Sequence, residues 1–578
     1  MPLNVLILTV DALRADRTSL HGYGRPTTPT FERLAANAVV CERAFALGTF
    51  TQSACVQMLT SSRPLSYGGY DHGAQGRPES LFKRLNDNGY RTISLSTLHW
   101  VNKYFGYGPG LDEETPLYIL NTFPGMLVAM VRDTLAAFDK GIIGEDAMLR
   151  DVGPMLTKFF ADVTDYCHWQ IDHGPTMAAD FPDSSIVNSG YDYGRVLALV
   201  ARHEREFNAH PAEYVRERVL PCALSERWMQ MWLPAEWYYL RRRGRLVEEA
   251  VHRLGNRLLR PFAPRLARAR DHRFKNYVDA AALADRLIKT LETVDRSRPF
   301  CLWTHFMDTH VPYVSGRGRT WYRQTPEYLR ALGHRADHGP GVVFDLKPRR
   351  LEDEAAFAAL YDAAVLATDR EIGRVIDALD RLGLRDDTLV VISGDHGEEL
   401  GEHGNWGHYF LLYDHNTRVP LMFHHPSFGA RRIGHLTTIL DFAPTVTDML
   451  GVPPAAAWEG QPVTAPDVAR RGHVLMETFY GGNCLFKHRP LYFGVRTDQL
   501  LYLWKEDRDP KDRYSLDGPE LYDLAVDPGQ RTNLYRDGDP RVDAMNALIA
   551  ARMAEIPEIA PERIARAFGT LAASVVAR

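Results

Sequence analysis

The sequence predicts an α/β fold, in which helices flank a doubly wound, mainly parallel sheet, and two observations carry that prediction. The first is a set of continuous apolar runs with the length of buried strands: NVLILTV (4–10), RTISLS (91–96), PFCLWTHF (299–306) and TLVVIS (388–393). The second is a pair of amphipathic, helix-like stretches between the runs, at 29–39 and 354–383. Strands of a parallel sheet are buried on both faces, so they need apolar residues throughout.

Each apolar run is followed by polar residues that could carry chemistry. Asp11 follows the first run, Thr97 and His99 the second, Asp308 and His310 the third, and Asp395 and His396 the fourth. Doubly wound sheets bind ligands at the carboxyl ends of their strands. We therefore expect these side chains to meet at one edge of the sheet.

The length of 578 residues and the change of pattern along the chain predict three parts. Residues 1–116 and 295–465 form the catalytic α/β domain, and a helix-rich insertion with many arginines and tryptophans occupies 117–294. Residues 466–578 form a smaller α+β unit. Within it, LYFGVRTDQLLYLWKE (491–506) is typical of a hairpin, and MNALIAARMAEI (545–556) is typical of a helix.

The region 228–275 of the insertion is dense in arginine. One interpretation is a solvated helix face that packs on the core through its leucines. The other is a contact surface for an anionic polymer, for membrane headgroups or for a second copy of the chain. The sequence leaves both interpretations open.

The overall composition argues against several classes of protein. With a formal net charge of -5, the chain shows no global signal for nucleic acid, and we expect none as a partner. The six cysteines have no CxxC spacing, which favours reduced thiols over a disulfide framework or a zinc site. The N-terminus lacks the basic region of a signal peptide, and no apolar stretch reaches the roughly 20 residues of a spanning helix. We expect a cytoplasmic protein without a transmembrane segment.

Asp395 and His396 are the strongest candidates for binding a metal ion. They stand side by side after an apolar strand and offer an oxygen and a nitrogen ligand to one divalent cation. The flanking Gly394 and Gly397 make the required turn easy. Asp11, at the end of another strand, is a plausible second carboxylate.

Five segments, in this order, resemble the sulfatase branch of the alkaline phosphatase superfamily: LTVDALRADRTSLHGYGRPTTPTFERLA, MLTSSRP, WTHFMDTHVPY, SGDHGEELGEHGNWGHYFLLYDHNTRVPLMF and PELYDLAVDPGQRTNL. The resemblance implies an alkaline phosphatase-like fold and one divalent metal ion, held by Asp11, Thr51, Asp395 and His396. Manganese, zinc, magnesium and calcium all suit such ligands. No second metal set is evident, because Gly373 stands where a two-zinc member has a histidine.

The resemblance also places the nucleophile. Aligning the family's leucine-threonine pair with Leu59 and Thr60 puts the nucleophile at Thr51, with Thr49 as the alternative. Cys55 then falls where the family motif has an arginine, so a formylglycine is not expected there. We expect Cys55 to be a buried thiol, or to contact the substrate anion if the helix start lowers its pKa. A helix over 52–60 would place Thr51 near N–H groups that favour an anion.

The remaining site residues follow from the same resemblance. It implies that His310 and His408 are catalytic and that one of them protonates the leaving oxygen. It implies a substrate-binding role for His99, Thr97, Cys55 and Asn405. We expect His403 and Arg418 to have architectural roles.

Together these residues predict a metal-dependent hydrolase, or a phospho-group transferase, that acts on a small anionic ester. A threonine nucleophile and the loss of the sulfatase lysine and arginine favour phosphate diesters or phosphonate monoesters over sulfate esters. One alternative is a sulfatase that works without formylglycine. Another is a family member that has lost turnover and serves as a binding or scaffold protein.

Overall fold

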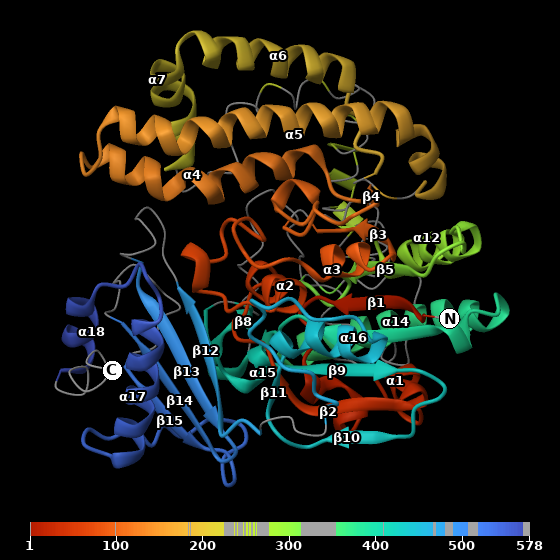
Figure 1. Cartoon of the computed structure of the whole chain (residues 1–578), viewed down its shortest axis with the longest axis vertical. Helices are drawn as coiled ribbons and strands as arrows, with labels where there is room; N and C mark the ends of the chain where they lie inside the picture. Colours follow the sequence, from red (N-terminus) through yellow and green to blue (C-terminus); the bar gives the residue numbers. More distant parts are fainter. Residues whose placement is uncertain are drawn as a thin grey trace.

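The structure is a computed structural model of the whole chain (Figure 1). It describes residues 2–98, 100–182, 187–224, 277–311, 354–408, 410–465, 470–479, 489–506 and 518–569, together with the isolated positions 184, 236, 240, 247, 250, 251, 254, 255, 258, 259, 262 and 313. His99 and most of the arginine-rich region 228–275 therefore lie outside the described residues.

One large sheet forms the centre of the molecule, with strand order β10-β2-β9-β6-β1-β5-β3-β4 and β11 paired to β2. Its strands are β1 (Asn4–Val10), β2 (Ala38–Phe45), β3 (Arg91–Ser96), β4 (Glu113–Pro116), β5 (Phe300–Phe306), β6 (Thr388–Gly394), β9 (Arg418–His424), β10 (Arg431–Ile433) and β11 (Thr437–Thr438). The four predicted strands are β1, β3, β5 and β6, and they pair in parallel. The predicted fold class is confirmed.

The antiparallel part of the sheet was not predicted. Strand β9 pairs antiparallel with both β2 and β6. The helix expected over 29–39 is too long, because α1 (Pro29–Ala35) ends before β2 begins at Ala38. Val39 and Val40 are buried in β2, so their β-branched side chains belong to the strand that follows the helix.

Both faces of the sheet are covered, as the alternation along β1 shows. Val5 and Ile7 pack in a core with α2 (Thr51–Thr60), α3 (Leu81–Asp87) and α16 (Phe442–Leu450). Leu6, Leu8 and Val10 point into a second core with α1, α12 (Ala280–Thr293) and α14 (Glu354–Arg381). Burial on both faces explains why the sequence of β1 is continuously apolar.

A layer of helices lies over one side of this domain (Figure 1). It contains α4 (Phe123–Asp139), α5 (Glu145–Asp180) and α6 (Tyr193–Ala209), followed by the short α7 (Pro211–Tyr214) and α8 (Leu220–Ala223). Apolar residues of α4, α5 and α6 join the same core as α2 and α3. The layer is therefore packed onto the α/β domain that contains the large sheet.

The C-terminal part forms its own antiparallel sheet beside the large one (Figure 1). Its strands are β12 (His473–Phe479), β13 (Leu491–Thr497), β14 (Leu500–Lys505) and β15 (Glu520–Asp523), and α17 (Pro540–Ala554) and α18 (Pro561–Phe568) follow them. The predicted hairpin is β13 and β14, and the predicted helix is α17. Among the residues described, every helix is too short or too polar to span a lipid bilayer.

Candidate active site

Asp11 and Asp395 meet at the carboxyl ends of the neighbouring strands β1 and β6. The backbone N–H of Asp395 donates to the carbonyl of Val10, and Oδ1 of Asp395 accepts a 2.9 Å hydrogen bond from the N–H of Ala12. Ala12 has a φ of 51°, a conformation that is costly for alanine. The hydroxyl of Tyr361 donates to the Ala12 carbonyl (2.6 Å) and thereby supports this turn.

Gly397 is required in the turn after His396 because the space is too small for a side chain. Its φ does not lie in the left-handed region. A Cβ atom at this position would instead lie 1.9 Å from the carbonyl oxygen of His415. The sequence predicted a glycine-assisted turn here, and the physical reason is close backbone approach.

Thr51 is the first residue of α2, and its side chain points at the two strand ends. Its hydroxyl donates to Oδ2 of Asp11 (3.1 Å) and lies 3.4 Å from Nε2 of His396. The N-cap of α2 is Phe50, so the hydroxyl of Thr51 does not cap the helix. The structure thus brings together all four residues that were expected to bind the metal.

The hydrogen bonds of His396 fix the direction of its lone pair. Its Nδ1 lies 2.8 Å from the carbonyl of Gly397, which can only accept, so Nδ1 carries a proton. In the neutral ring, Nε2 then has a lone pair directed at Oδ2 of Asp395 (3.5 Å) and the hydroxyl of Thr51. This is the tautomer that a metal-binding histidine needs.

His305, at the end of β5, also enters the site, and the sequence did not single it out. Its Nε2 lies 3.3 Å from Oδ2 of Asp11 and 3.8 Å from Oδ2 of Asp395. Its Nδ1 lies 2.7 Å from the hydroxyl of Thr9, which in turn accepts a hydrogen bond from the indole N–H of Trp303. The Thr9 hydroxyl donates to the carbonyl of Thr304 (3.2 Å), so it is free to accept from Nδ1–H of His305.

The donor set fits a metal ion. Asp11, His305 and Asp395 form a completely buried group whose ligand atoms lie within 4.8 Å of one another. Oδ1 of Asp11 and Oδ2 of Asp395 are buried without a hydrogen-bond partner among the described residues. Burial alone would raise the pKa of Asp11, but the facing His310, His305 and His396 lower it far below its usual range. Two buried carboxylates that face imidazole nitrogens are stabilised by a cation between them.

Three imidazole rings line the site beside these ligands. The ring of His408 lies 4.5 Å from that of His396 and 4.9 Å from that of His310, centre to centre. Burial lowers the pKa of His408 to about 4, and the neighbouring His310 adds to this effect. His408 is buried, whereas His310 is half-buried and directs its Nδ1 at the carbonyl of Val311 (2.7 Å).

Glu398 is a second residue that the sequence did not single out. Its Oε1 lies 3.1 Å from Nδ1 of His408, so it orients that ring. Burial raises the pKa of Glu398 to about 8, despite the opposing effect of His310 and His396. The negative charge of Asp11 contributes to this rise.

Thr97, Cys55 and Asn405 are the other described residues that were expected to bind the substrate. The hydroxyl of Thr97 donates to the carbonyl of His305 (2.6 Å), so it holds β3 against β5. Cys55 is completely buried, and burial together with the charges of Asp395 and Asp11 raises the pKa of its thiol. Burial and these two carboxylates therefore oppose the lowering by the helix N-terminus that was considered for Cys55. Asn405 is half-buried, and its backbone closes the turn after Glu402.

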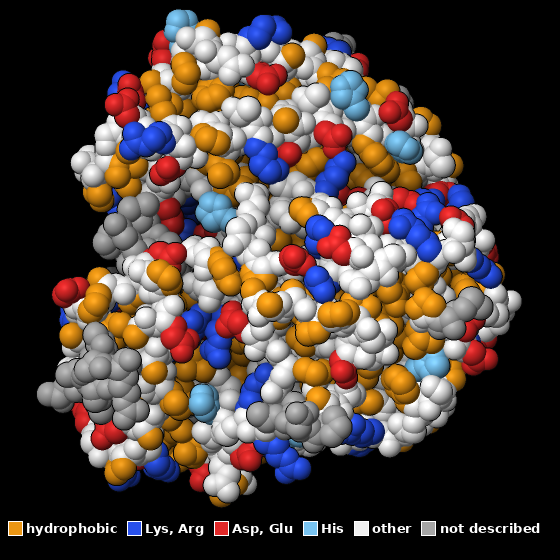
Figure 2. Space-filling model, viewed as in Figure 1, with side chains coloured by type: hydrophobic (Ala, Val, Ile, Leu, Met, Phe, Trp, Pro, Cys, Tyr) orange, Lys and Arg blue, Asp and Glu red, His pale blue; other side chains and the backbone are white. Residues whose placement is uncertain are grey.

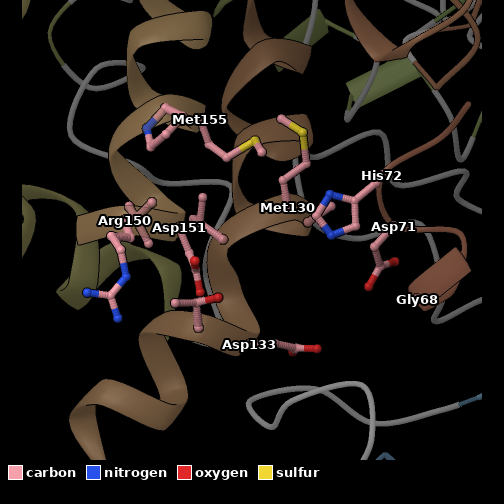
Figure 3. A pocket seen from close by; sticks show the side chains of 13 residues that line it. Gly68, Asp71, His72, Met130, Asp133, Arg150, Asp151 and Met155 are labelled. Atoms are coloured by element: carbon pink, nitrogen blue, oxygen red, sulfur yellow. The ribbon is translucent and has the colours of Figure 1, made fainter. Parts of the chain in front are cut away.

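A cavity lies apart from the clustered site residues (Figure 3). It has a volume of about 430 Å³ and is lined by Gly68, Asp71, His72 and residues of α4 and α5. Two of its carboxylates share one cation, because Arg489 pairs with both Asp71 (2.7 Å) and Asp133 (2.8 Å). It contains none of the clustered site residues. On the face shown in Figure 2, basic and acidic side chains are interspersed.

Comparison with known protein families and sequences gives a consistent result. The family model described as Sulfatase matches residues 3–115 and 226–452. Choline-sulfatase of Rhizobium meliloti (strain 1021) is 29% identical over 284 residues, which are 46% of this chain and 52% of that protein. Arylsulfatase K of Rattus norvegicus is 29% identical over 283 residues, 43% of this chain and 48% of that protein. The chain spans about half the length of these curated relatives.

Solved structures show the same fold. The phosphonate monoester hydrolase of Agrobacterium radiobacter superposes with a TM-score of 0.53 at 16% identity, covering 95% of both chains. A protein solved with its substrate D-glucosamine-2-N,6-O-disulfate superposes with a TM-score of 0.54 at 16% identity, covering 96% of this chain and 98% of that one. At these identities the likeness concerns the fold.

Proposed function

The chain belongs to the sulfatase family of the alkaline phosphatase superfamily, and from that premise we propose that it hydrolyses phosphate diesters or phosphonate monoesters through a covalent Thr51 intermediate. The observation that carries this proposal is the position of the Thr51 hydroxyl, 3.1 Å from Asp11 and 3.4 Å from His396. An alcohol becomes a nucleophile when a neighbouring group stabilises its alkoxide. The side chains around Thr51, which include the carboxylate of Asp11 and the imidazole of His396, can hold a cation that would stabilise this alkoxide.

Five side chains would hold one divalent cation in this site: Asp11, Thr51, His305, Asp395 and His396. The bound cation would supply the positive charge that favours the alkoxide of Thr51 and an incoming anion. Mixed carboxylate and imidazole ligands suit manganese and zinc, and they also accept magnesium or calcium. His305 extends the ligand set inferred from the family resemblance.

The chain's own residues then perform two displacements. In the first, Oγ of Thr51 attacks phosphorus as the alkoxide, the bond from phosphorus to the leaving oxygen breaks, and that oxygen takes a proton from the imidazolium of His310. In the second, the now neutral His310 takes a proton from a water molecule whose oxygen attacks phosphorus, the bond from phosphorus to Oγ breaks, and Thr51 is released as the alkoxide. His310 suits the proton donor because its ring is only half-buried and Nδ1 is fixed by Val311, which leaves Nε2 for the substrate. His408, oriented by Glu398, would hold a nonbridging oxygen.

The nature of the nucleophile favours phosphoryl over sulfuryl esters. A phosphothreonine can be resolved by attack of water, or by an acceptor alcohol in a transferase. A sulfothreonine resists attack at sulfur, and an alcohol lacks the elimination route of an aldehyde hydrate. A formylglycine, which would form such a hydrate, is not expected at Cys55, because that position aligns with the arginine of the family motif.

Hydrolysis of sulfate esters is the second candidate, and the relatives favour it. The matching family model is Sulfatase, and the curated relatives include a choline-sulfatase and arylsulfatases. The same geometry would serve this reaction if water can resolve the sulfothreonine. Both candidates imply a small anionic ester as the substrate.

One assay separates these candidates from a scaffold role. Metal-loaded protein is incubated with an aryl phosphate diester, an aryl phosphonate monoester and an aryl sulfate, in parallel with the Thr51→Ala variant. We expect the phosphorus esters to be turned over fastest and the variant to lose turnover. Faster sulfate turnover would support the second candidate. No turnover of any ester, or an equally active variant, would contradict a Thr51-dependent hydrolase.

A further inference from the structure

The structure leaves an apolar stripe exposed in the segment between α8 and α12. Val247, Val251 and Leu254 are each 61% exposed, Leu258 is 64% exposed and Phe262 is 90% exposed. The first four are helical, and their spacing of four, three and four residues is the sequence pattern of one face of an amphipathic helix. We call these five residues the 247–262 stripe.

The stripe belongs to a segment that is anchored at both sides. Before it, Leu240 packs against the main core, and its carbonyl accepts a 3.2 Å hydrogen bond from the N–H of Asp192, the N-cap of α6. After it, Tyr277 and Val278 are buried at 7% and 1% exposure. The described residues that flank the stripe in the sequence are therefore packed, whereas the five residues of the stripe are exposed.

The sequence around the stripe is strongly basic. Residues 241–275 contain 12 arginines and lysines but only 3 acidic residues, a formal charge of +9. The rest of the chain together carries a formal charge of -14. Arginine occupies positions 253, 257 and 260, between members of the stripe. Apolar and cationic residues that alternate at helical spacing are typical of a helix lying in the plane of a membrane interface.

We propose that the 247–262 stripe binds the surface of a bilayer that contains anionic phospholipids. The valines, the leucines and Phe262 would enter the boundary between headgroups and acyl chains, and the arginines of this segment would pair with lipid phosphates. This inference is independent of the proposed ester hydrolysis. It would place the active site at a membrane surface.

Two other occupants explain less of what is observed. A sulfated polysaccharide or a nucleic acid would be held by the arginines, but it would leave the exposed valines and leucines without a partner. A second copy of the chain would cover the apolar stripe, but it would bring two segments of charge +9 together. An anionic lipid surface satisfies both the apolar and the basic residues.

Vesicle flotation with the full chain tests the proposal. Vesicles of phosphatidylcholine alone are compared with vesicles that also contain about one third phosphatidylglycerol. We expect the protein to float with the anionic vesicles only, and less so at high salt, because surface charges are screened. Leu254→Ser with Leu258→Ser should weaken binding at least about tenfold, through lost apolar burial. Arg253→Gln with Arg257→Gln should weaken it by about fivefold per arginine.

Val526→Ser is the matched control, because Val526 is also an exposed apolar residue (79%) but lies outside the stripe. It should float like the wild type, and all variants should keep the wild-type melting temperature. Equal flotation with neutral vesicles, or unchanged binding by the leucine double variant, would overturn the proposal. So would binding to heparin, or dimerisation in sedimentation experiments, in the absence of flotation.

Discussion

The hydroxyl of Thr51 lies 3.1 Å from Oδ2 of Asp11, and this contact joins the start of α2 to the end of β1. If Thr51 is the nucleophile, Thr51→Ala should lower kcat by at least about a thousandfold, because the covalent route is lost. Thr51→Ser should keep measurable turnover, because it retains a hydroxyl. Acid quenching of the wild type during turnover, followed by peptide mass spectrometry, should find the phosphoryl or phosphonyl group, with its remaining substituent, on Thr51.

Thr49→Ala is the control for the position of the nucleophile. Thr49 is also buried and lies two residues before Thr51. The phosphate adduct should persist in this variant if its fold is retained by circular dichroism. An adduct that disappears with Thr49 and survives in Thr51→Ala would show that the assignment is shifted by two residues.

His305 should contribute to metal affinity. Nε2 of His305 faces both Asp11 and Asp395, so His305→Asn removes one nitrogen from the cluster. We expect manganese or zinc to bind about 10–100-fold more weakly, which isothermal titration of the metal-free protein would measure. His310→Asn is the matched control and should bind metal like the wild type. Equal affinities of the two variants would contradict a ligand role for His305.

His310 should matter most for esters with poor leaving groups. If it protonates the leaving oxygen, His310→Asn should slow turnover of alkyl esters by about 10²–10⁴-fold. The same variant should barely change the rate for a nitrophenyl ester, because nitrophenolate departs without a proton. A plot of log kcat/KM against the leaving-group pKa checks this. Parallel lines for variant and wild type would assign proton donation to another residue.

The strands that carry the site could be predicted because they are buried on both faces, whereas β2 could not. β1 and β6 have continuous apolar sequences, and the polar residues after them, Asp11 and Asp395, stand out. β2 contains Glu42 and Arg43 within it, so its sequence lacks the signal of a buried strand. His305 was missed because it stands inside the apolar run of β5. Its role depends on pairing with Thr9 in β1, and that register is a long-range property.

The salt bridge between Arg552 and Glu477 should be one of the larger contributions to stability. Nε of Arg552 lies 2.6 Å from Oε2 of Glu477, both side chains are buried, and Oε1 of Glu477 also accepts from the N–H of Leu65. Arg552→Met leaves a buried carboxylate without its partner, which should lower the free energy of unfolding by about 3–5 kcal/mol. Denaturation with urea measures this.

Arg541→Met is the control for that experiment. Arg541 also forms a close ion pair, with Asp539 at 2.6 Å, but it is 46% exposed. Exposed pairs contribute little because solvent screens them. This variant should unfold at the same urea concentration as the wild type. A similar loss in both variants would show that burial does not decide the contribution of these pairs.

Glu402 should make stability depend on pH in the acid range. Burial alone would raise its pKa, but Arg14, whose Nη1 lies 2.9 Å from Oε1 of Glu402, lowers it to about 2. Because the folded-state pKa is below the unfolded value of about 4.3, this contribution is complete above that value and is lost as pH falls towards 2. In Glu402→Gln, the free energy of unfolding should therefore fall less steeply between about pH 5 and pH 3, by on the order of 1–3 kcal/mol. Glu562→Gln, at an exposed position of α18, should follow the wild-type curve. If Glu402→Gln also follows the wild-type curve, the ion pair with Arg14 does not cause the loss of stability at acid pH.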